Sequence, residues 1–104
     1  MLFQPHLYSR TRHLAHELGQ ALAGADVVAV ADVYAARERN GIVRGKLVVD
    51  AVSDARGGAR VAWMPTRDQG AVWLARHARP GDVILTVGAG DVDAAVPVVL
   101  AELA

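Results

Sequence analysis

Short apolar runs alternate along the chain with longer amphipathic segments. The apolar runs, at 27–33, 59–64 and 82–87, are rich in valine or other apolar residues and are bounded by polar or glycine-containing stretches. Runs of this kind are typical of strands that are buried on both faces of a parallel sheet. A still shorter run at 2–4 predicts a stub of one further strand.

Helical spacing fills the intervals between these runs. Apolar residues recur with a helical period over 14–22, so we expect a helix that Ser9 caps and Gly24 ends. A second helix is expected around 47–52, and the glycine pair at 57–58 should end it.

The last third of the chain predicts two more helices. One should run from a cap at Asp68 to about Ala78, before a turn at 80–81. Proline fits only the first turn of a helix, so we expect a short turn near 91–95 and a final helix that starts close to Pro97.

This order of elements predicts an α/β fold. We expect a single three-layer, Rossmann-like domain over residues 1–104, with a mainly parallel sheet flanked by helices. Ligands of such folds bind outside the carboxyl ends of the strands. The positions that follow the four expected strands are His6, Tyr34, Thr66 and 88–91. They should share one edge of the sheet, which is the candidate working surface.

Composition narrows the classes of partner. Eleven basic and eleven acidic residues cancel, so a nucleic-acid partner is not expected. The chain has no cysteine, which excludes disulfides and thiolate catalysis and fits a reducing cytoplasm. No apolar run approaches the roughly 20 residues that cross a bilayer, and no signal segment is found. We therefore expect a cytoplasmic protein without a membrane partner.

The segment FQPHLYSRTR, residues 3–12, carries the first candidate chemistry. The free N–H groups of a helix start attract anions, and Arg10 in the first turn adds a guanidinium suited to a carboxylate. An arginine there opposes the helix dipole at a small cost, which suggests that its charge serves something outside the helix. Spacing alone favours the alternative, a surface arginine beside an ordinary helix start.

Two further segments follow strands. Asp32, in DVYAARE, is either a ligand contact or a cap for the loop after it. The turn at 88–91 either brings N–H groups to a phosphate or carboxylate or is only a tight turn; the dinucleotide fingerprint is incomplete and no Walker A pattern exists. His13 and His16 lie one helical turn apart without a third ligand, so no metal site is predicted.

Taken in order, these segments resemble the C-terminal domain of the Mur ligases. FQPHLYSRTR is similar to the family segment FQPH-x-Y-[ST]-R-T, DVYAARE to D-V-Y-x-A-R-E, and GDVILTVGAGDV to G-D-x-x-L-x-x-G-A-G-D-V. The match covers nearly the whole chain, and the branch that it resembles joins L-alanine to UDP-N-acetylmuramate. The chain departs from the pattern at 39–45, where the family usually has prolines.

The resemblance implies a ligase of peptidoglycan biosynthesis, and with it a role in the cell wall, cell shape and cell division. The full-length enzyme uses ATP and Mg²⁺. Its UDP-sugar and central ATPase domains are absent from these residues, so we expect this domain to bind no cofactor and to catalyse nothing alone. The implied partners are the central ATPase domain, L-alanine and, through the other domains, UDP-N-acetylmuramate.

The resemblance also implies roles for single residues. His6 and Arg10 are expected to hold L-alanine, with Arg10 on its carboxylate. No catalytic residue is expected in this domain. The candidate cleft-lining residues are Tyr8, Asp32, Tyr34, Gly88, Gly90 and Asp91.

Two other classes of protein stay open. A free-standing small-molecule or nucleotide-binding α/β module would bind its ligand without partners, and this is the main alternative. A phospho-receiver-like domain shares the alternating pattern but needs a lysine at the end of a late strand. The only lysine, Lys46, lies in an expected helix, which makes this class the weaker of the two.

Overall fold

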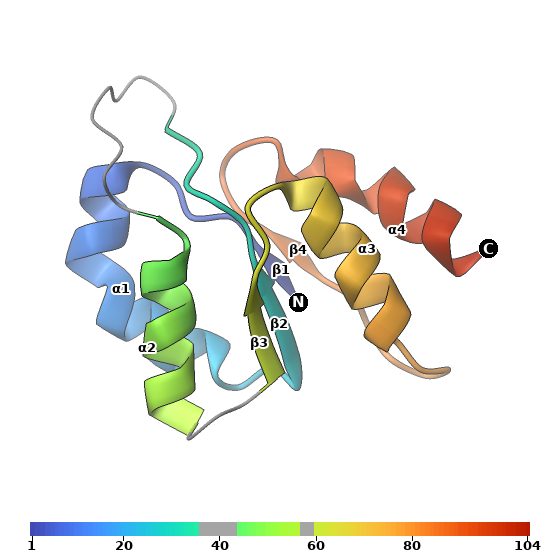
Figure 1. The fold of residues 1–104 in the computed structure, drawn as a ribbon, viewed down its shortest axis with the longest axis horizontal. Helices are drawn as coiled ribbons and strands as arrows, with labels where there is room; N and C mark the ends of the chain where they lie inside the picture. The colour runs from blue at the N-terminus through green and yellow to red at the C-terminus, as the bar shows by residue number, and fades with distance from the viewer. Residues whose placement is uncertain (36–43, 57–59) are drawn as a thin grey trace.

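Four parallel strands form the centre of the structure, in the order β3-β2-β1-β4 (Figure 1). The structure is a computed structural model that describes residues 1–35, 44–56 and 60–104. The strands are β1 (Leu2–Phe3), β2 (Val27–Val30), β3 (Arg60–Trp63) and β4 (Thr86–Val87). The helices are α1 (Tyr8–Leu22), α2 (Lys46–Arg56), α3 (Arg67–His77), the 3₁₀ helix η1 (Val92–Ala95) and α4 (Val96–Leu103).

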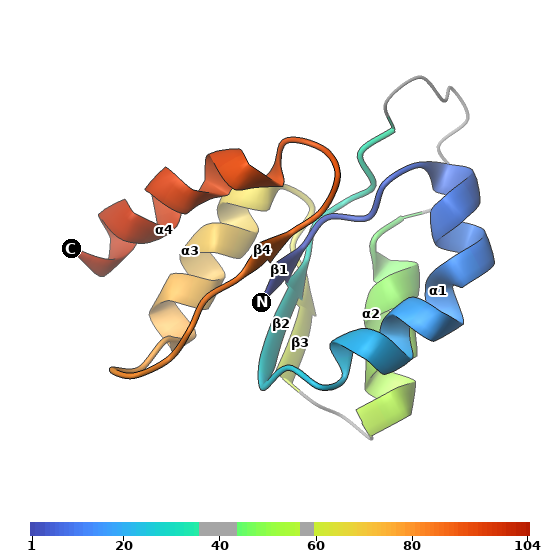
Figure 2. The same ribbon diagram turned by 180° about the vertical axis from the view of Figure 1, so that it is seen from behind.

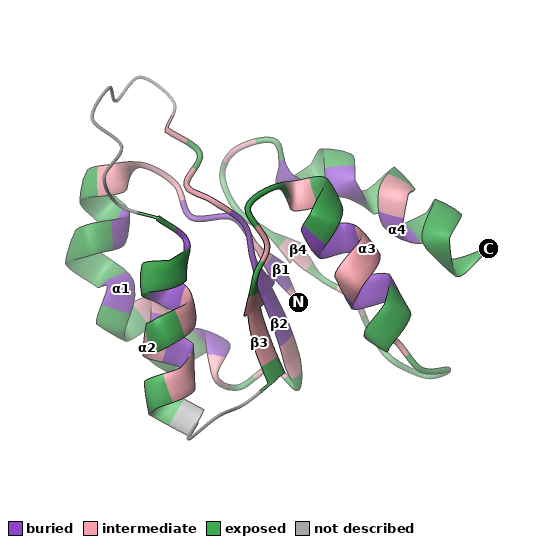
Figure 3. Cartoon of the chain, viewed as in Figure 1, coloured by how far each residue is buried: buried purple, intermediate pink, exposed green. Residues whose placement is uncertain are grey.

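The helices cover both faces of the sheet, as the alternation of elements predicts. α1 and α2 lie on one face, and α3 and α4 lie on the other (Figures 1 and 2). Successive strand residues point to opposite faces. Val28 and Val30 therefore pack with α1 and α2, whereas Leu2 and Ala29 pack with α3 and α4. The buried positions follow this division along the sheet (Figure 3). The α/β fold class is confirmed.

Two predicted helix caps are wrong. α1 begins at Tyr8, and Leu7 is its N-cap residue. Ser9 therefore lies inside the first turn and not at the cap. α3 is capped by Thr66, whose side chain accepts a hydrogen bond from the Gln69 N–H while the Gln69 side chain accepts one from the Thr66 N–H. This reciprocal capping box satisfies two N–H groups at once, and the expected cap Asp68 lies in the first turn instead.

All four strands are shorter than the apolar runs that predict them, and the difference is largest for β2 and β4. The run at 82–87 contributes only Thr86 and Val87 to the sheet, because its neighbour β1 pairs with it from Leu2 onward. β2 stops at Val30 rather than at residue 33. The chain beyond β2 still follows β1, through a single bridge between His6 and Tyr34.

The C-terminal prediction is confirmed. η1 occupies the expected turn, and α4 starts at Val96 with Pro97 in its first turn. The glycine pair at 57–58, expected to end α2, and most of the loop at 39–45 lie outside the described residues. In the part of the chain that the structure describes, no helix is both long and apolar enough to span a membrane.

Close packing of α1 on α2 makes Gly19 a sensitive position. A Cβ at residue 19 would lie 2.5 Å from the Ala51 Cβ and 2.6 Å from the Ala51 carbonyl carbon. Alanine normally stabilises a helix interior over glycine by about 1 kcal/mol, but overpacking costs about 1–3 kcal/mol. Since two of the three Ala51 atoms within 2.8 Å belong to the backbone and cannot withdraw freely, the overpacking cost should be about 2–3 kcal/mol, and we expect Gly19→Ala to lower the free energy of unfolding by roughly 1–2 kcal/mol in urea titrations. The neighbouring exposed change Gln20→Ala should be close to neutral, and a Gly19→Ala protein as stable as the parent would contradict the packing argument.

Candidate functional site

The carboxyl edge of the sheet brings His6 and Tyr34 together. The chain segments that follow β1 and β2 stay paired, because the Tyr34 N–H donates to the Pro5 carbonyl at 2.8 Å and the Leu7 N–H donates to the Tyr34 carbonyl at 2.9 Å. The two rings are stacked, with centroids 6.0 Å apart and planes at 14°. These residues thus meet at the edge that the strand order predicts.

Arg10 lies beside His6. Its Nη1 is 3.4 Å from the His6 Nδ1, and since a guanidinium only donates, the ring nitrogen accepts. Arg10 is exposed in the first turn of α1, so the guanidinium stays open to a ligand. Tyr8, a candidate cleft residue, is the half-buried first residue of the same helix.

Leu7 makes the sharp change of direction that leads from β1 into α1. Its φ is 65° and its ψ is 135°, a conformation that non-glycine residues rarely adopt, and such backbone strain costs about 1–3 kcal/mol. The Leu7 carbonyl offsets part of this cost by accepting from the Thr11 N–H at 3.0 Å and from the Thr11 hydroxyl at 2.7 Å. Strain of this kind is retained where the surrounding structure demands one geometry, and here it sets His6 and Arg10 side by side.

The glycine turn after β4 closes against Tyr34. A Cβ on Gly90 would lie 2.6 Å from the Tyr34 Cγ and 2.8 Å from the Gln4 Oε1, and one on Gly88 would lie 2.9 Å from the Gln4 carbonyl oxygen. Only a residue without a side chain lets the turn approach so closely. The structure therefore brings Gly88 and Gly90 to the same edge as His6.

Asp91 is held in place from two sides. The Gln4 Nε2 donates to its Oδ1 at 2.9 Å, and the Arg67 Nη1 donates both to its carboxylate and, at 3.2 Å, to its backbone carbonyl. The pKa of Asp91 lies below its ordinary value of 3.8, first because of the Gln4 hydrogen bond and also because of the Arg67 charge, while burial acts in the opposite direction. Gln4 and Arg67 thus anchor the turn that borders Tyr34.

The Asp32 side chain contacts the chain segment that leads into α2. Its Oδ1 accepts from the Gly45 N–H and from the Trp63 Nε1, each at 3.0 Å, and Arg44 lies 3.6 Å from Oδ2. Of the two roles that the sequence left open, these contacts match the cap for the chain after β2, at the start of α2. Asp32 shares the edge but is engaged away from the His6–Tyr34 pair.

Curated proteins similar to this chain share one name. A UDP-N-acetylmuramate–L-alanine ligase of Kineococcus radiotolerans is 53% identical over 105 residues, which cover 100% of this chain and 22% of the relative. Ligases of that name from Mycolicibacterium smegmatis and Desulforamulus reducens are 51% and 45% identical and cover 97% and 88% of the chain. The chain belongs to the UDP-N-acetylmuramate–L-alanine ligase family. None of the protein-family models searched matches it.

The match is to a part of these ligases. The chain spans about a fifth of the length of the curated relatives, 22% in the first and 20% in the other two. The matching part is their C-terminal region. What the rest of such a ligase does is therefore not carried by these residues.

Two residues of this ligase segment escaped the sequence analysis. Gln4 stands inside the FQPH motif directly after β1, and a polar residue at the end of an apolar strand run is a signal that the sequence does offer; in the structure Gln4 is 7% exposed. Arg67 gave no such signal, because its contact with Asp91 joins positions 24 residues apart. Among the described residues, no group of three His, Asp or Glu side chains has the arrangement of a metal site.

The anchoring of Asp91 predicts a pH-dependent stability. Because its folded-state pKa is depressed, the carboxylate stabilises the fold above the ordinary value of 3.8, and this contribution is lost as the pH falls through the lower folded value. Asp91→Asn should therefore be less stable than the parent in urea at pH 7, with a difference that shrinks below about pH 4. The exposed Asp93→Asn is the control, and a difference that stays constant down to pH 2 would contradict the assignment.

Proposed function

We propose that this chain is the amino-acid-presenting part of an ATP-dependent ligase that adds L-alanine to UDP-N-acetylmuramate in peptidoglycan synthesis. The observation that carries the proposal is the guanidinium of Arg10 beside the His6 ring, at the carboxyl edge of a parallel sheet. The names of the relatives support the reaction and the substrates. The lack of cysteine fits the cytoplasmic location that we assign.

Arg10 is the proposed partner of the L-alanine carboxylate. A guanidinium offers two parallel N–H groups to the two oxygens of a carboxylate, and such a charge-assisted contact is worth about 1.5–3 kcal/mol. His6 lies beside Arg10, and because its Nδ1 accepts from that guanidinium, its Nε2–H is the donor that we assign to the same carboxylate. With the carboxylate held by Arg10, the amine of L-alanine is left to attack the activated carboxyl carbon of UDP-N-acetylmuramate.

The main contribution that we assign to this domain is to orient the amine of L-alanine for the reaction. Fixing the amine close to its target replaces a collision between free molecules, and this accounts for a large part of the rate in such reactions. The Tyr34 ring, confined between His6 and Gly90, borders the place where the amino acid would lie.

We assign no ATP or Mg²⁺ site to these residues. The glycine-rich turn at 88–90 is followed by Asp91, whose carboxylate is already paired with Arg67, and among the described residues no group of three His, Asp or Glu side chains could hold a metal ion. The sequence has no P-loop lysine. We assign the binding of ATP, Mg²⁺ and UDP-N-acetylmuramate to the other domains of a longer ligase, with the central ATPase domain as the direct partner of this one.

A chimeric ligase tests the proposal. In it, this chain replaces the matching C-terminal part of the Kineococcus radiotolerans enzyme, to which it is 53% identical. We expect phosphate release that depends on both L-alanine and UDP-N-acetylmuramate, whereas the isolated chain should release none above background. A folded but inactive chimera would contradict the proposal. Clear calorimetric saturation of the isolated chain by ATP or a UDP-sugar would favour the free-standing binding module instead.

A further inference from the structure

Arg67 has the least exposed side chain among the arginines of the ion pairs that the structure describes. It is 29% exposed, against 64% for Arg44 and 71% for Arg76. The Arg67 Nε donates to the Asp68 carboxylate at 3.2 Å, and its Nη1 donates both to the Asp91 carboxylate and to the Asp91 carbonyl. One guanidinium thus binds the side chain and the main chain of Asp91, which fixes that residue more firmly than a single ion pair could.

Gln4 holds the same residue from its place directly after β1. Its Nε2 donates to the Asp91 Oδ1 at 2.9 Å, and its side chain is buried. The Gln4 Oε1 is buried as well, yet no described group donates a hydrogen bond to it. Because a buried polar atom without a partner destabilises a fold, stability alone does not account for a glutamine at this position. What the side chain does supply is a fixed place for Asp91.

The place of Asp91 decides where the glycine turn lies. Gly90 directly precedes Asp91, and a Cβ at position 90 would lie 2.6 Å from the Tyr34 Cγ. The Tyr34 ring stacks on His6, and the His6 Nδ1 accepts from Arg10. A continuous set of contacts therefore runs from the start of α3, on one face of the sheet, to the first turn of α1, on the other face (Figure 1).

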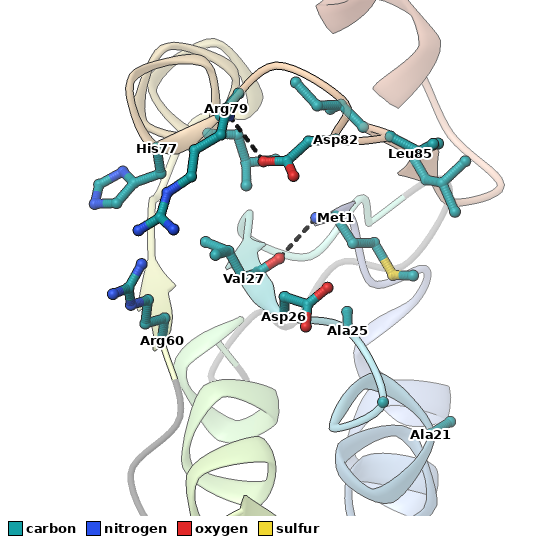
Figure 4. Close-up of a pocket in the computed structure, with 15 residues that line it drawn as sticks. Met1, Ala21, Ala25, Asp26, Val27, Arg60, His77, Arg79, Asp82 and Leu85 are labelled. Atoms are coloured by element: carbon teal, nitrogen blue, oxygen red, sulfur yellow. Dashed lines mark hydrogen bonds between the residues drawn. The ribbon is translucent and has the colours of Figure 1, made fainter.

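The opposite edge of the sheet has arginines without such contacts. Arg60 and Arg79 line a pocket at that edge together with His77 (Figure 4). Asp82 accepts from the backbone N–H of Arg79 at 2.8 Å. In the described part of the chain, no ion pair joins the guanidinium of Arg60 or Arg79 to a carboxylate. Arg67 is therefore distinguished by the contacts that it makes and not by its charge.

We propose that Arg67 is a positioning residue for the amino-acid site. It holds Asp91 so that the glycine turn at 88–90 stays against Tyr34, and Tyr34 in turn keeps the His6 ring beside Arg10. Arg67 touches no substrate in this arrangement and acts only through Asp91. The inference rests on the proposed function, because His6 and Arg10 are the groups that we assign to the L-alanine carboxylate.

Arg67→Ala in the chimeric ligase tests the proposal through kinetics. We expect KM for L-alanine to rise about three- to tenfold, because the groups that bind its carboxylate lose their fixed place, while KM for ATP stays unchanged. Arg67→Lys keeps the charge and some of the donors, so its KM should lie between the two. Arg76→Ala removes the exposed pair with Glu102, and Arg79→Ala removes an unpaired charge. Both controls should keep the KM of the unmodified chimera.

A double variant tests whether Arg67 acts through Asp91. Asp91→Asn breaks the same ion pair, so it should also raise KM for L-alanine. The combination of Arg67→Ala with Asp91→Asn should then raise KM little further than the stronger single change, because neither residue has the other left to hold. Rises that multiply in the double variant would contradict a shared action.

Hydrogen exchange in the isolated chain tests the proposal without any activity. The Tyr34 and Leu7 N–H groups join the segments that follow β1 and β2, whereas the Ala31 N–H donates to the Phe3 carbonyl nearer the sheet. We expect Arg67→Ala to speed exchange at Tyr34 and Leu7 about three- to tenfold more than at Ala31, because loss of the pair opens the site locally.

Two outcomes would overturn the proposal. One is equal acceleration at Tyr34, Leu7 and Ala31, which would mean that Arg67 only adds to global stability. The other is the same KM for L-alanine in Arg67→Ala and Arg76→Ala when the unmodified chimera is active. An inactive unmodified chimera would contradict the proposed function instead, and the exchange rates would then decide the role of Arg67 by themselves.

Discussion

Arg10→Ala, made in the chimeric ligase, should raise KM for L-alanine about ten- to a hundredfold and leave KM for ATP unchanged. The guanidinium lies 3.4 Å from the His6 ring and is the charged group that we assign to the amino-acid carboxylate. Its loss removes about 1.5–3 kcal/mol of charge-assisted binding. Phosphate release measured against L-alanine concentration gives the value.

Two variants serve as controls for this result. Arg12→Ala removes an exposed arginine two residues along the same helix, and it should leave KM for L-alanine unchanged. Arg10→Lys keeps the charge but loses the fork of donors, so its KM should fall between those of the parent and Arg10→Ala. Equal KM values for Arg10→Ala and Arg12→Ala would remove Arg10 from the site.

Gly90→Ala should damage both stability and activity. The new Cβ would lie 2.6 Å from the Tyr34 Cγ and 2.8 Å from the Gln4 Oε1, and neither can withdraw freely, since Tyr34 stacks on His6 and Gln4 is bonded to Asp91. Overpacking of this degree costs about 1–3 kcal/mol. We expect a lower urea midpoint for the isolated chain and a reduced kcat/KM for L-alanine in the chimera.

Gly24→Ala is the matched change for this prediction. A Cβ there would meet only the Ala21 carbonyl oxygen, at an ordinary 3.6 Å. Its effect on stability should be small and its effect on activity absent. If Gly90→Ala behaved like Gly24→Ala in both assays, the close approach of the glycine turn to Tyr34 would have no functional meaning.

The parts of the site that follow from strand order could be predicted. Parallel strands end at one edge, so the positions after the strands had to converge, and His6, Tyr34 and Gly90 do. Arg10 follows from helical geometry once α1 starts near residue 8. The alternation of valine-rich runs with helical periods was sufficient for the α/β fold.

The parts that depend on side-chain contacts could not be predicted. Asp91 is held by Gln4 and Arg67, which lie 87 and 24 residues away in the sequence, and no local pattern joins them. The choice of Thr66 over Asp68 as a cap depends on one reciprocal pair of hydrogen bonds. The length of β4 depends on where β1 pairs with it, and the sequence of the run at 82–87 carries no information about that pairing.

The most direct test compares L-alanine with L-alaninamide as substrates of two chimeric ligases. One is the unmodified chimera, called the parent, and the other is its Arg10→Ala variant. L-alaninamide keeps the amine but lacks the negative charge that the guanidinium is proposed to hold. The account predicts that the parent prefers L-alanine in kcat/KM by about ten- to a hundredfold and that Arg10→Ala loses most of this preference. A preference of the same size in both proteins would mean that another group binds the carboxylate.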